Sequence, residues 1–196
     1  MPETNTWHPL TASPLAPAQA PTGVWTGRRL IVVVSGRDPD GRLYPSRYAR
    51  AAAYDPTSNT WRRITPLPSA RSGAAGVWTG SELLVIGGAT LNGGANVAST
   101  GFAYDPGLDR WRALPRMLPL RPGFVAVWGA GRLFLWGGAG NKYGVEYPPA
   151  AGRWFTLPAA PLRARDDPAV VWTGKALIVW GGQAASDGAS FQLTTD

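Results

Sequence analysis

The sequence has no cysteine and a single histidine, His8, among its 196 residues. The lack of cysteine excludes disulfides, thiolate metal sites and thiol catalysis. One histidine argues against an imidazole-based metal site and against a histidine-centred triad. A phosphate-binding glycine loop and a nucleophile elbow are also missing. We therefore expect no metal, no cofactor and no catalytic residue.

Long apolar runs are missing too, because none approaches the length of a membrane span. The first residues, MPETNTWHPL, lack the basic start and apolar stretch of a signal peptide. We expect a soluble protein without a membrane partner, in a compartment that the sequence leaves open. Charged residues make up 16% of the chain and apolar residues 44%, so the chain can bury a core.

The net charge of +7 favours anionic partners. The basic residues are spread along the chain and form no continuous basic run, so we expect no specific nucleic-acid partner. The alternative is a solvated, arginine-rich surface without a partner.

A repeated stretch dominates the sequence. Val77–Gly88 reads VWTGSELLVIGG, and similar stretches begin at Val24, Val127 and Val171. In each, an apolar run ends in Trp, a tight turn follows, and a second apolar run leads to a glycine. The repeat recurs about every 49 residues, a period typical of a β-propeller. Two sets of tryptophans follow it: Trp25, Trp78, Trp128 and Trp172, then Trp7, Trp61, Trp111 and Trp154.

Each repeat reads as four strands, named a to d from the inside out. In the second repeat we expect them near 73–78, 82–87, 99–105 and 110–114. Thr-Gly and Asp-Pro dipeptides supply the reversals between strands. The continuous apolar runs suit strands buried on both faces, and the double glycine suits a sharp turn without room for a Cβ. We predict an all-β fold, a β-propeller of about four four-stranded blades. The expected blades are 22–64, 73–114, 123–157, and 168–195 completed by 6–10.

These residues resemble the Kelch repeat. The second repeat matches it at Gly87-Gly88, at Tyr104-Asp105-Pro106 and at Trp111. The first repeat departs from it with Ser35-Gly36 in place of the double glycine, and the third has lost the aspartate of the turn. The resemblance covers essentially the whole chain. It implies a propeller scaffold that binds proteins or ligands through its loops, commonly with six or seven blades.

The two ends of the chain complement each other. Residues 6–10 read as a strand d, and the chain ends after a strand c. Joining the ends gives DPETNTW, which is similar to DPTSNTW at Asp55–Trp61. One interpretation is a closed four-bladed monomer in which 6–10 complete the last blade and remove a free edge. The other is a four-repeat piece of a larger or engineered propeller, which would self-associate to cover its ends.

Three arginines lie in phase before strand a, each seven residues before its Trp: Arg71, Arg121 and Arg165. In this topology the d–a and b–c loops share one face. Kelch domains that bind acidic peptides carry arginine at the matching place, so the resemblance implies an arginine-rimmed pocket there. Its partner would be an acidic peptide, a protein or an anionic glycan. Alternatively, these arginines cap the starts of the strands, or pair with Asp166, Asp167 or main-chain carbonyls.

The longest loop, 36–50, adds candidate ligand-binding residues. Interleaved arginine and tyrosine suit a partner site, and the candidates are Arg37, Arg42, Tyr44 and Arg47. A solvated loop is the alternative.

Three functional hypotheses follow. The first is a non-catalytic binding module that uses the arginine-bearing face. The second is a structural or engineered propeller unit whose property is ring closure or self-assembly. The third is an enzyme that resembles Kelch-type sialic-acid epimerases, which needs an acid–base set in a central pocket. We favour the first, because the sequence offers arginines and scattered acids but no such set.

Overall fold

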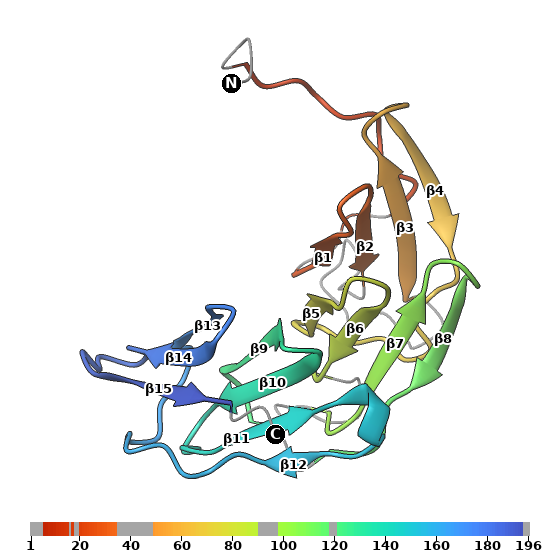
Figure 1. The fold of residues 1–196 in the computed structure, drawn as a ribbon. Helices are drawn as coiled ribbons and strands as arrows, with labels where there is room; N and C mark the ends of the chain where they lie inside the picture. The colour runs from red at the N-terminus through yellow and green to blue at the C-terminus, as the bar shows by residue number, and fades with distance from the viewer. Residues whose placement is uncertain are drawn as a thin grey trace.

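The computed structural model describes residues 6–15, 17, 20–34, 49–89, 98–117 and 121–193. They form four antiparallel sheets that follow one another along the chain, which confirms the predicted β-propeller fold (Figure 1). In the described part, no helix is both long and apolar enough to cross a membrane.

Each sheet is one blade of consecutive antiparallel strands. The first blade contains β1 (Thr22–Trp25), β2 (Leu30–Val34), β3 (Arg50–Asp55) and β4 (Thr60–Ile64). The second contains β5 (Ala75–Trp78), β6 (Leu83–Ile86), β7 (Gly101–Asp105) and β8 (Arg110–Ala113). The third contains β9 (Phe124–Gly129), β10 (Arg132–Gly137), β11 (Gly144–Tyr147) and β12 (Phe155–Thr156), with a 3-10 turn, η2 (Pro149–Ala151), before β12. The fourth contains β13 (Ala169–Trp172), β14 (Ala176–Trp180) and β15 (Gly188–Gln192).

Alternate residues of one strand serve two different cores, which explains the continuous apolar runs. In β6, Leu83 and Val85 pack against the first blade, whereas Leu84 and Ile86 pack against the third. All four side chains are buried. A strand between two blades therefore needs an apolar side chain at every position.

The outer strands are held by a repeated aromatic pair. The rings of Tyr104 and Trp111 lie 5.0 Å apart between centroids, and the matching pairs of the first and third blades lie 5.1 and 5.0 Å apart. The indole N–H of Trp111 donates to the carbonyl of Thr65, in the segment that leaves the preceding blade. These contacts account for the Tyr and Trp of the repeat as packing residues.

The double glycines adopt the backbone conformation expected from the sequence. Gly87 and Gly88 have φ of 66° and 81°, and Gly181 and Gly182 have φ of 65° and 90°. A Cβ on Gly88 would lie 2.9 Å from Cβ of Arg71, and one on Gly182 would lie 2.6 Å from a carbonyl oxygen. Glycine is required there both by its positive φ and by the lack of space.

The expected closure of the fourth blade by residues 6–10 is contradicted. The fourth sheet has three strands, and the described residues 6–10 are exposed and form no strand. The segment that follows them is bound to the first blade: Trp61 Nε1 donates to the carbonyl of Thr11 over 2.9 Å, and Asn59 also contacts Thr11. In Figure 1 the N-terminal segment extends from the first blade, away from β15.

The blades are arranged as an arc. Their innermost strands contact one another in the order β1, β5, β9 and β13, and β1 and β13 lie at the two ends in Figure 1. The outward faces of the end blades carry exposed apolar side chains. Ile178 and Trp180 are 37% and 56% exposed, whereas Phe134 and Trp136, at the same positions of the third blade, are 0% and 3% exposed.

Candidate functional site

The segments before strands a carry the three in-phase arginines, and the structure separates them into two kinds. Arg71 and Arg165 are buried, whereas Arg121 is exposed. Arg71 and Arg165 precede β5 and β13, and Arg121 precedes β9.

Arg71 binds the main chain of its own blade. Its Nη1 donates to the carbonyl oxygens of Gly87 over 3.0 Å and Thr100 over 2.6 Å, and Nη2 donates to the Thr100 hydroxyl over 2.7 Å. The guanidinium lies 4.8 Å from the centre of the Phe102 ring. Burial lowers the pKa of Arg71 below its ordinary value, because desolvation disfavours the charged form. The carbonyl oxygens compensate for that desolvation.

Arg165 makes the equivalent contacts in the fourth blade. Its Nη1 donates to the carbonyl oxygens of Gly181 and Asp187, each over 3.1 Å, and lies 3.0 Å from the Asp187 carboxylate. The hydrogen bond from Arg165 lowers the pKa of Asp187. For Arg71 and Arg165, the alternative of main-chain carbonyl partners is therefore confirmed. The aspartate that pairs with Arg165 is Asp187, in place of the expected Asp166 or Asp167.

Arg121 lies at a pocket of about 420 Å³ on the third blade. The pocket opens between the segment before β9 and the loop after β10. Its lining combines apolar strand residues with polar loop residues: Phe124, Leu135, Trp136, Gly137, Gly140, Asn141, Tyr143, Val145 and Thr156. These lining residues include no carboxylate, so Arg121 gives the pocket a positive charge.

The pocket occupies the place that an arginine side chain fills in the second blade. Leu135 pairs with Val145 as Val85 pairs with Phe102, so Val145 stands where the Phe102 ring lies under Arg71. The carbonyl of Gly137, which corresponds to that of Gly87, accepts a hydrogen bond from the Asn141 amide over 3.4 Å. That short side chain leaves the rest of the space empty.

The polar groups of the pocket suit an anion. Arg121 supplies guanidinium donors, and Tyr143 lies at the rim, half exposed. The ammonium of Lys142 lies 5.7 Å from the centre of the Tyr143 ring and adds a second positive charge nearby. A carboxylate that enters the pocket would meet the guanidinium donors of Arg121, with the ammonium of Lys142 outside the lining residues.

Asn141 and Tyr143 were not predicted from the sequence. The available signal is their position shortly after Gly137-Gly138, the double glycine of the third repeat, where Tyr143 aligns with Thr100. The predicted residues Arg37, Arg42, Tyr44 and Arg47 lie outside the described residues, so their role stays a prediction. Across the described ranges, no three His, Cys, Asp or Glu residues form a group that could hold a metal ion.

Comparison with known proteins supports the fold. No family description matches the sequence, and no curated protein matches it. Among solved structures, the chain is similar to the structure of YjhT, with a TM-score of 0.67 and 18% sequence identity. The match covers 90% of this chain and 61% of that one. At this level of identity the likeness shows a β-propeller, and the Kelch relationship remains a resemblance.

Proposed function

We propose that this protein is a non-catalytic binding module that holds the anionic group of a partner in the pocket of the third blade. The observation that supports this proposal is the contrast among the three arginines. The second and fourth blades bury Arg71 and Arg165 against their own carbonyl groups, whereas Arg121 is exposed beside an open pocket. The partner would be an acidic peptide, a protein with an acidic segment, or an anionic glycan.

Physical chemistry favours a carboxylate as the bound group. The guanidinium of Arg121 can donate two parallel hydrogen bonds to one carboxylate. The apolar wall of Leu135, Trp136 and Val145 lowers the local dielectric constant and strengthens that interaction. Binding is expected to weaken as salt is added, since exposed charges are screened.

Calorimetric titration with capped tetraglutamate tests the proposal, with tetraglutamine as the uncharged control peptide. We expect Arg121→Ala to weaken tetraglutamate binding about tenfold, since it removes a charged hydrogen-bond donor. The matched control is Arg110→Ala, because Arg110 is an exposed arginine on β8, away from the pocket. Equal affinity of wild type and Arg121→Ala would refute the proposal, and sialyllactose in place of the peptide tests the glycan alternative.

A further inference from the structure

A second pocket lies between the first and second blades, at the turns that join strands a and b. Its volume is about 260 Å³. The residues at its apolar floor come from both blades and include Ile31, Ala53, Ile64, Trp78 and Tyr104. Three arginines of the first blade also line it: Arg28, Arg29 and Arg62. The proposed binding face is formed by other loops, so this is a separate site.

In the second and third blades, the positions that correspond to Arg29, Ala53 and Arg62 carry one arginine and one glutamate, whose charges cancel. In the second blade, Arg112 donates to both carboxylate oxygens of Glu82, over 3.1 and 2.7 Å. In the third blade, Arg132 donates to Glu146 over 3.1 and 3.2 Å. Each blade thus matches one arginine with one glutamate at these positions.

The first blade lacks that glutamate. By strand register, Arg29 corresponds to Glu82, Arg62 corresponds to Arg112, and Ala53 stands at the position of Glu146. In the first blade, these positions therefore hold two arginines, Arg29 and Arg62, with Ala53 on the strand between them. The methyl group of Ala53 leaves open the space that a glutamate side chain would fill.

The carboxylates near the pocket already have partners. Asp55 accepts a hydrogen bond from Arg29 Nε over 3.1 Å and one from the Thr57 N–H. Asp109 accepts from the Tyr104 hydroxyl and from the N–H of Thr65. Hydrogen bonds from Arg29 and from Tyr104, respectively, lower the pKa of these two carboxyl groups, so both are ionised at neutral pH.

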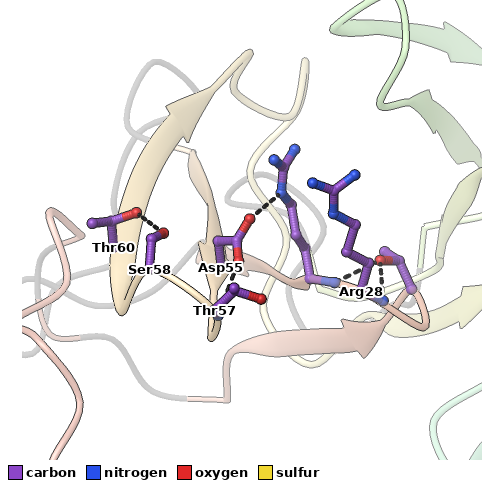
Figure 2. Close-up of polar contacts among 7 residues, drawn as sticks. Arg28, Asp55, Thr57, Ser58 and Thr60 are labelled. Atoms are coloured by element: carbon purple, nitrogen blue, oxygen red, sulfur yellow. Dashed lines mark hydrogen bonds and ion pairs between the residues drawn. The ribbon is translucent and has the colours of Figure 1, made fainter.

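Two of the three arginines form no ion pair within the described part of the chain: Arg28 and Arg62. Figure 2 shows Arg28 extending beside the ion pair of Arg29 and Asp55. The pocket thus combines two guanidinium groups that form no ion pair with the partly exposed indole of Trp78. Asp55 attracts Arg28 and Asp109 attracts Arg62 at longer range, but both carboxylates accept hydrogen bonds from other groups.

We propose that this pocket between the first and second blades binds a small organic anion, one that joins a flat apolar body to a carboxylate or phosphate group. The flat body would lie against the partly exposed indole of Trp78, and the anionic group would reach Arg28 and Arg62. Guanidinium groups recognise both oxyanions in the same way, through paired hydrogen bonds.

The test uses 2-naphthoate, 2-naphthyl phosphate and the uncharged 2-naphthalenemethanol as probes. Calorimetry gives the affinities, and the indole N–H signal of Trp78, assigned with Trp78→Phe, reports where each probe binds. We expect at least one of the anions to bind saturably and to shift that signal, and the alcohol to bind about tenfold more weakly. The comparison of carboxylate with phosphate identifies the preferred anion.

Three variants distinguish this site from other effects. Arg62→Ala is expected to weaken binding about tenfold. Ala53→Glu restores the charge pair of the neighbouring blades and fills the pocket, so it is expected to abolish binding. Arg110→Ala removes an exposed arginine elsewhere and should change nothing, and Arg121→Ala should also leave this site intact. Anion binding that survives Ala53→Glu, equal affinity for the alcohol, or no anion binding at millimolar concentration would each overturn the proposal.

Discussion

Arg71 donates a hydrogen bond from Nη1 to the carbonyl oxygen of Gly87 over 3.0 Å, which joins the segment before β5 to the double glycine after β6. Arg165 and Gly181 repeat this relationship in the fourth blade. An arginine in phase with the repeat can therefore belong to the scaffold. Its role depends on whether a main-chain carbonyl of its own blade is available to it.

Replacing the buried arginine tests this structural role. Arg71→Met leaves the carbonyl groups of Gly87 and Thr100 without their donor in the interior, so it is expected to lower the free energy of unfolding by about 2–4 kcal/mol. Arg121→Met changes an exposed side chain and should cost less than about 0.5 kcal/mol. Urea denaturation of both variants measures the difference. Equal losses would contradict the assignment.

The double glycine gives a second stability prediction. Gly182→Ala combines a φ of 90° with a Cβ placed 2.6 Å from the carbonyl oxygen of Asp166. Gly174 has nearly the same φ, 91°, but a Cβ added there would meet no atom within 4 Å, so Gly174→Ala adds the conformational cost alone. We expect Gly182→Ala to lower the free energy of unfolding by at least about 2 kcal/mol more than Gly174→Ala. Thermal unfolding measured by calorimetry compares the two.

Much of this architecture could be predicted from the sequence, because it depends on local chemistry. Thr-Gly and Asp-Pro turns, apolar strands and double glycines each require a particular local conformation, and their period placed the blades. The choice between a closed ring and an open arc could not be made from the sequence, because the rotation between blades is determined by side-chain packing across their faces, as where Trp172 stacks on Phe134 at 5.7 Å. For this reason the complementary ends of the sequence suggested a closure that the structure lacks.

The sequence predicted where the three arginines lie, but it did not predict which of them are buried. The phase of Arg71, Arg121 and Arg165 placed all three on the same face, but phase does not distinguish a buried arginine from an exposed one. The difference lies in the loop after strand b. In the third blade Asn141 donates to the carbonyl of Gly137, which corresponds to the Gly87 carbonyl that Arg71 binds in the second blade. A short polar side chain after the double glycine is thus the signal for an open site.

A turn of the second blade predicts a dependence of stability on pH. The Tyr104 hydroxyl donates to Asp109 over 2.5 Å, and this bond, more than any other contact, lowers the pKa of Asp109 below its ordinary value. The unfolded chain therefore binds the proton more readily. The stabilisation is present above the ordinary pKa and is lost as the pH falls through the lowered one.

We expect Tyr104→Phe to reduce the loss of stability between about pH 5 and pH 2, compared with wild type. The control is Tyr54→Phe, because the Tyr54 hydroxyl donates to the uncharged Asn59 at the same place in the first blade. It should lower stability by a similar amount at every pH. Urea midpoints across this range measure both effects, and identical pH profiles for the two variants would refute the role of Asp109.

The exposed faces of the end blades predict self-association. Val171, Ile178 and Trp180 occupy positions that the first three blades bury against a following blade. The exposed Trp25 lies on the opposite face, on the first blade. In the later blades the equivalent tryptophans, Trp78, Trp128 and Trp172, pack against the blade before them. We therefore expect two copies to associate through these faces in a concentration-dependent manner.

Light scattering after size exclusion measures this association. Trp180→Lys is expected to shift the mass toward the monomer, because it places a charge in the contact. Leu108→Lys changes an exposed leucine on a turn and should have no effect. A monomer at every concentration in the wild type would contradict this expectation.

The most direct test of the proposed function is charge reversal at Arg121. Calorimetric titrations of wild type and Arg121→Glu with capped tetraglutamate and capped tetralysine compare the two preferences at low salt. If Arg121 holds the partner's carboxylate, wild type prefers tetraglutamate and Arg121→Glu prefers tetralysine, with each preference about tenfold or more. Undiminished tetraglutamate binding by Arg121→Glu would contradict the account.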